Sequence, residues 1–98
     1  MAVMLKMVTT KPSDTYFFSD VNPSVLDDFR KWQVYHEHVM GKHQTQVNSD
    51  TWEHVFIFET QELCSLYLSE RNDHPAHKSI TAHQAANGQT VVETVTII

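Results

Sequence analysis

Cysteine is almost absent from this chain, since Cys64 is the only one among 98 residues. A lone cysteine cannot form a disulfide within the chain, which excludes the disulfide frameworks of small secreted domains. Cys64 lies between Leu63 and Leu66 in a segment with helical character. This context favours a buried thiol over a reactive nucleophile.

Long apolar segments are also missing. No stretch approaches the length of a membrane span. The apolar N-terminus is too short for a signal-peptide core and is interrupted by Lys6. We therefore expect a cytoplasmic protein with no membrane partner.

Basic residues are few and scattered. Seven Lys and Arg stand against twelve Asp and Glu, and the formal net charge is -5. Phosphate binding needs clustered Lys and Arg, so nucleic acid is not an expected partner. The hydrophobic share of 41% and the charged share of 19% are ordinary for a globular protein. A chain of this length can form one core, and we expect a single domain that spans residues 1–98.

The strongest pattern is a predicted strand at residues 52–59. One face carries Trp52, His54, Phe56 and Phe58, and the other carries Glu53, Val55, Ile57 and Glu59. A half-solvated strand is apolar on one face only, whereas here Val55 and Ile57 make the second face apolar as well. This predicts a central strand in a sheet that is covered on both sides. The chain's own helices can provide one cover, and a second subunit is the natural candidate for the other.

The chain alternates strand-like and helix-like segments. The expected order is strand 2–9, a helix from Asn22 or Ser24 to Met40, strand 43–48, strand 52–59, a helix from Thr60, a second helical segment from Pro75, and strand 89–98. This order, strand, helix, strand, strand, helix, strand, predicts a ferredoxin-like α+β fold with a four-stranded antiparallel sheet. We expect the helix-free face of that sheet to pack against the same face of a second copy, which gives a homodimer.

Three local details accompany this prediction. Gly41 is expected to end the first helix, whose apolar stripe is Val25, Phe29, Trp32, His36 and Val39. The helix after Thr60 is expected to turn Leu63, Leu66 and Tyr67 inward, with residues 70–73 breaking the pattern. Residues 16–18 form an aromatic group that is either a loop anchored on the core, a strand extension or a flap over a pocket.

The segment from the central strand onward resembles the stress-responsive A/B barrel family, within the dimeric α/β barrel superfamily. The resemblance rests on Val55–Glu59, on Tyr67, and on the His74-Pro75-Ala76-His77 motif. It implies a ferredoxin-like fold that pairs into a dimeric α/β barrel. Some relatives cyclise polyketides and others oxidise aromatic molecules without a cofactor. By resemblance, Tyr67 and His77 would be the catalytic residues.

Seven histidines, all between residues 36 and 83, are the most unusual part of the composition. His77 is the best candidate for a general base, because a neutral imidazole near pH 7 can take a proton from a phenol or an activated methylene. The alternative is structural, with His74 capping the helix and the His77 ring packed at the sheet edge. His54 is expected either to line a pocket with aromatic walls or to lie in a packed dimer core.

Metal binding is not expected. His36 and His38 would point to different faces of a helix, and the His74–His77 pair has no acidic residue one turn further on. Zinc sites usually use three or four well-placed ligands.

The functional hypothesis is a small cofactor-independent enzyme, cyclase-like or monooxygenase-like, that acts on an aromatic or polyketide-like molecule in a barrel pocket. The alternative is a non-catalytic ligand-binding or structural homodimer that shares the fold. The predicted catalytic residues are His77 and Tyr67, and the predicted ligand-binding residues are His54, Trp52, Phe56, Phe58 and His74.

Overall fold

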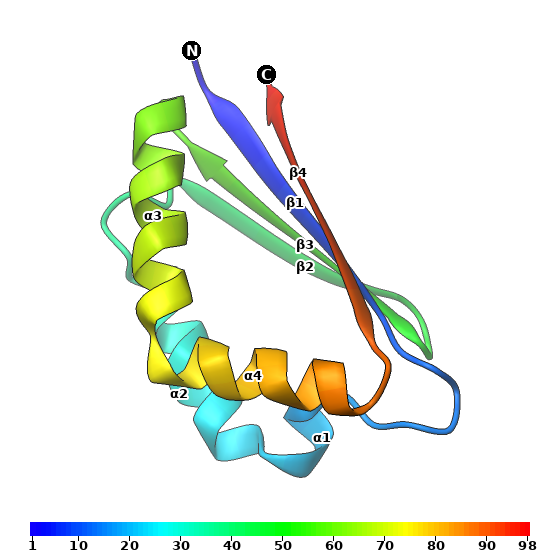
Figure 1. Ribbon diagram of the computed structural model, residues 1–98. Coiled ribbons are helices and arrows are strands. Elements are labelled where there is room, and N and C mark those ends of the chain that lie inside the picture. The colour runs from blue at the N-terminus through cyan, green and yellow to red at the C-terminus, as the bar shows by residue number, and fades with distance from the viewer.

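The computed structural model describes the whole chain, residues 1–98, as an antiparallel sheet with helices on one side (Figure 1). The strands are β1 (Val3–Thr10), β2 (Gly41–Asn48), β3 (Thr51–Phe58) and β4 (Thr90–Ile97). Their order across the sheet is β2-β3-β1-β4, and each neighbouring pair is antiparallel. The predicted ferredoxin-like fold is confirmed, and β3 is an interior strand as its two apolar faces indicated.

All the helices lie on the same side of this sheet (Figure 1). They are α1 (Phe18–Val21), α2 (Pro23–Val34), α3 (Gln61–Asp73) and α4 (Pro75–Ala86). None of them combines the length and the apolar character that a membrane-crossing helix needs.

Alternation along β1 shows how the two faces of the sheet differ. Its odd-numbered residues from Val3 to Thr9 are buried under the helices, whereas Met4, Lys6 and Val8 are only half-buried. Pairing in register extends both faces across the sheet, with Leu5 opposite Phe56 on the covered face. The core on that face is made by Val3, Leu5, Met7, Phe56, Phe58, Cys64 and Tyr67. The opposite face has no cover within the chain.

Three helix ends follow local capping chemistry. The Thr60 hydroxyl accepts a hydrogen bond from the Leu63 backbone N–H at 3.2 Å and begins α3. Pro23 occupies the first turn of α2 behind Asn22, so the Asn22 start is confirmed over the Ser24 start. Gly88 follows α4 with a φ of 65°, a conformation that glycine adopts without strain.

The first long helix is shorter than predicted. It ends at Val34, and Gly41 begins β2 instead of ending a helix. The reason is that Met40 donates its backbone N–H to the Ile57 carbonyl at 2.8 Å and so joins the sheet. His36 nevertheless packs its ring on Trp32 at 5.1 Å between centroids. The turn after α2 thus brings His36 to the same side as Trp32, which is the arrangement that the apolar spacing had attributed to a longer helix.

Helix α3 differs from the prediction in its inward face and its length. Leu66 is 52% exposed, whereas Cys64, Tyr67 and Arg71 are buried. Residues 70–73 continue the helix and do not break it. The buried residues follow one another at helical spacing, and the last of them, Arg71, is charged. A search for apolar residues alone does not find it.

The aromatic segment at residues 16–18 is partly helical. Phe18 begins the short helix α1, and both Phe17 and Phe18 are buried. The Phe17 backbone N–H donates to the Asp20 carboxylate at 3.1 Å, which supports this single helical turn. Tyr16 and Phe17 lie in a loop that leads into this turn, so the segment is not a strand extension and fits a loop anchored on the core by its buried aromatic rings.

Candidate functional site

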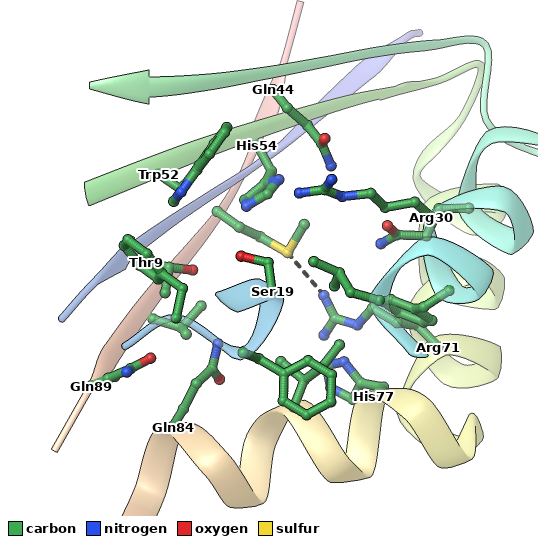
Figure 2. Close-up of a pocket in the computed structure, with 18 of the residues that line it drawn as sticks. Thr9, Ser19, Arg30, Gln44, Trp52, His54, Arg71, His77, Gln84 and Gln89 are labelled. Carbon is green, nitrogen blue, oxygen red and sulfur yellow. Dashed lines mark hydrogen bonds between the residues drawn. The ribbon is translucent and has the colours of Figure 1, made fainter. Parts of the chain in front are cut away.

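A cavity of about 130 Å³ lies between the covered face of the sheet and the helices. Its walls come from all four strands on the sheet side and from all four helices on the helix side (Figure 2). Phe17, Phe18, Phe29 and Trp52 make much of the wall aromatic. The cavity lies within one chain, whereas the sequence hypothesis put a pocket between the sheets of two chains.

His54 projects from β3 into this cavity next to Trp52, and the two rings stack with centroids 6.2 Å apart. The pKa of His54 is lowered to about 4, mainly by burial and in addition by the positive charges of Arg30 and Lys42. His54 is therefore a neutral imidazole at pH 7, able to donate one hydrogen bond and to accept one.

His77 enters the cavity from the first turn of α4, on the side opposite the sheet (Figure 2). Burial is the main cause that lowers its pKa, and the nearby Arg71 charge adds to the effect. Its ring is tilted against that of Phe29 at 6.2 Å. A half-buried, neutral imidazole at this position has the protonation state that a general base needs at pH 7.

His74 has the structural role that the alternative hypothesis gave it. Its Nδ1 accepts a hydrogen bond from the Ala76 backbone N–H at 3.1 Å and begins α4. Its ring packs edge-on against Phe29 and tilted against Trp32, at 5.1 and 5.0 Å. His74 does not line the cavity.

Tyr67 and the two phenylalanines of β3 lie in the core beside the cavity. Tyr67, Phe56 and Phe58 are all 0% exposed, and none of them lines the cavity. The Tyr67 hydroxyl accepts a hydrogen bond from Gln33 Nε2 at 3.0 Å, and burial raises its pKa to about 12. Gln33 does line the cavity, so Tyr67 can reach a ligand only through this amide. The structure thus brings together Trp52, His54 and His77 from the predicted set.

Two arginines in the cavity wall were not predicted. Arg71 is 5% exposed, and its Nη1 lies 2.6 Å from Glu93 Oε1 and 3.1 Å from Met7 Sδ. Arg30 projects from α2 toward His54 and Gln44 (Figure 2). One signal in the sequence could have indicated them. Glu93 is a charged residue between Val91 and Val95 on the inward face of the last strand, and a charge in such a position needs a partner of opposite charge.

No protein-family model matches the sequence, and no curated protein matches it either. Solved structures do resemble the fold. A variant of SnoaB, a cofactor-independent oxygenase from Streptomyces nogalater, superposes with a TM-score of 0.72 at 8% identity, covering 99% of this chain and 92% of that one. Rv0793 from Mycobacterium tuberculosis has a TM-score of 0.70 at 11% identity, covering 100% and 95%.

A Dabb family protein with a ferredoxin-like fold, from Mesorhizobium loti, has a TM-score of 0.57 at 17% identity and covers 98% of this chain and 97% of its own. The chain therefore has a ferredoxin-like fold. At these identities the likeness concerns the fold, and the chemistry of the site rests on the residues of this chain.

Proposed function

We propose that the protein oxidises a small phenolic aromatic molecule with molecular oxygen and without a cofactor. The observation that carries this proposal is the pair His54 and His77, two imidazoles on opposite walls of one aromatic cavity, each with its pKa lowered by burial. The likeness of the fold to a cofactor-independent oxygenase supports the same reaction class.

His77 acts as the base in this proposal. It takes the proton from the phenol, and the resulting phenolate is electron-rich enough to reduce oxygen directly. A ring carbon that carries hydrogen gains one oxygen atom and becomes a carbonyl carbon. His77 returns its proton to the peroxide formed at this carbon. The O–O bond then breaks while the ring carbon loses its hydrogen as a proton, and the second oxygen atom leaves as water. Phenol and O₂ thus give quinone and water, and the substrate supplies all the electrons.

The remaining site residues position the substrate. Trp52 offers a flat surface for the aromatic ring, and His54 can donate a hydrogen bond to a carbonyl oxygen from its neutral ring. Tyr67 acts indirectly, by holding the Gln33 amide in one orientation at the cavity wall.

We also propose that two copies pair through the helix-free face of the sheet. Met4, Val8, Val55 and Ile57 on this face are only half-buried in the single chain. On the edge strand β4, Val92 is 60% exposed. A face of this composition fits the apolar core of a homodimer interface.

Oxygen consumption with a panel of electron-rich phenols tests the reaction. The intact protein should consume oxygen and produce quinone absorbance, and His77→Gln should lower the rate about 10²-fold or more, because glutamine cannot take and return a proton. His38→Gln is the matched control, since His38 lies in the turn after α2 and does not line the cavity. Equal rates for His77→Gln and the intact protein contradict the proposal. Binding of phenols without oxygen consumption would favour the non-catalytic alternative.

A further inference from the structure

Building on the proposed function, which makes the cavity the ligand site, we infer that its ligand is a single-ring aromatic anion whose acidic group is bound by Arg30. The class includes benzoate-type carboxylates and does not include fused polycyclic molecules. Two independent observations carry the inference: the balance of charge around the cavity and its size.

The two arginines in the wall differ in how their charge is balanced. Arg71 is neutralised by Glu93, with 2.6 Å between Nη1 and Oε1. Arg30 also lines the cavity, yet none of the ion pairs or side-chain hydrogen bonds in the structure includes it. The cavity therefore has one positive charge with no partner from the protein.

The groups nearest Arg30 increase the need for an anion. Its positive charge lowers the pKa of both His54 and Lys42, in addition to the larger effect of their burial. Lys42 is held over the Phe56 ring, with Nζ 5.6 Å from the centroid, and also has no carboxylate partner. A carboxylate at Arg30 would relieve this repulsion and would accept the two parallel N–H donors of the guanidinium.

The geometry leaves room for a ring beside that carboxylate. Arg30 follows Leu26 by four residues and precedes Gln33 by three, so all three side chains share the cavity face of α2. Figure 2 shows the guanidinium pointing toward His54, with Trp52 beyond it on the same strand. A carboxylate at Arg30 thus directs its attached ring along the face that contains Trp52 and His54.

The size of the cavity favours a ligand with one ring. Its volume is about 130 Å³. An engineered apolar cavity of about 150 Å³ in another protein accommodates benzene, which sets the scale for a single ring. A fused three-ring molecule needs two to three times as much space, so part of it would lie outside the cavity or displace the aromatic walls.

Binding of matched probes, measured by isothermal titration and by quenching of tryptophan fluorescence, tests the inference. Benzoate should bind at least about tenfold more tightly than benzamide, its neutral isostere, because the amide cannot form the charge-assisted pair. Anthracene-9-carboxylate should bind more weakly than benzoate. Arg30→Gln should remove the preference for benzoate over benzamide, and Arg30→Lys should restore part of it. The control is Lys31→Gln, which removes an exposed cation from the same helix and should leave binding unchanged.

Equal affinities for benzoate and benzamide, or tighter binding of anthracene-9-carboxylate, would overturn the inference, and so would an unchanged preference in Arg30→Gln. Circular dichroism melts of each variant exclude loss of folding as the cause. Benzoate has no phenolic hydroxyl, so its binding does not depend on turnover. Benzoate binding without oxidation of any phenol would contradict the proposed reaction alone. Oxidation of phenols without a preference for benzoate over benzamide would contradict this inference alone.

Discussion

Arg71 and Glu93 form an ion pair that joins helix α3 to the edge strand β4, with 2.6 Å between Nη1 and Oε1. Arg71 is 5% exposed, whereas the Glu93 side chain is 36% exposed. The guanidinium also donates to Met7 Sδ on β1, so one side chain contacts three elements beside the cavity. Both residues line the cavity, and Glu93 neutralises the buried charge of Arg71.

The first prediction concerns this pair. Glu93→Gln should lower the free energy of unfolding by about 2 kcal/mol, because it leaves the buried Arg71 without a counter-charge while Glu93 itself keeps some solvent contact. Urea denaturation measures the change. Glu37→Gln is the control, since the Glu37 side chain is 80% exposed and its 3.6 Å contact with His38 should contribute close to nothing. Equal stabilities of the two variants would mean that solvent already screens Arg71.

The second prediction concerns Trp32. Its ring stacks on Phe29 at 5.6 Å and on Tyr67 at 5.8 Å, so it links α2 to the core although it is only half-buried. Trp32→Ala should therefore cost about 3 kcal/mol of unfolding free energy, the lower end for large aromatic truncations. Tyr35→Ala removes a side chain of an 84% exposed residue and should cost far less. A loss below about 1 kcal/mol for Trp32→Ala would show that the stack contributes little.

Much of the fold could be predicted from local patterns. The alternation in residues 52–59 identified an interior strand, and Thr60, His74 and Pro75 identified helix starts, because capping depends on neighbouring residues only. The end of α2 could not be predicted in this way. Gly41 suits a helix end in sequence, but the hydrogen bond from Met40 to Ile57 in the sheet decides the outcome. Contacts between distant segments override local signals at such positions.

The candidate site was predictable only in part for the same reason. The sequence pattern showed that His54 and Trp52 share a strand face. It did not show where along this face the packed core ends and the cavity begins. Phe56 is covered by α3, whereas His54 meets the open space under α2 and α4. Arg30 and Arg71 resemble ordinary helix-surface residues until the sheet is placed against them. Their position depends on tertiary packing, which spacing along the chain does not encode.

The third prediction concerns assembly. Light scattering at micromolar concentration should give about twice the chain mass of 11.3 kDa, because the helix-free face of the sheet is largely apolar. Ile57→Glu places a charge on that face and should give a monomer. Val34→Glu places the same charge on the outer side of α2, at a residue that is 52% exposed, and should leave the mass unchanged. A monomeric intact protein would show that this face stays open in solution.

The last prediction concerns the pH dependence of stability, through His54. Its pKa is about 4 in the folded protein and near the ordinary 6.5 in the unfolded chain. Between these values the unfolded state binds more protons than the folded state, so stability falls as the pH drops through this window. His54 alone should lower the free energy of unfolding by about 2 kcal/mol between pH 7 and pH 5.

Other groups can also contribute to the pH dependence of stability, so the measurement is a difference between two proteins. Urea denaturation of the intact protein and of His54→Gln at both pH values isolates the contribution of His54, because the variant lacks this one ionisable group. The stability of the variant should fall by about 2 kcal/mol less than that of the intact protein. An equal loss of stability in the two proteins would place the pKa of His54 in the folded protein near 6.5, which requires a solvated ring. The cavity at His54 would then be open to water, and the electrostatic basis of both the oxidation and the Arg30 site would be much weaker.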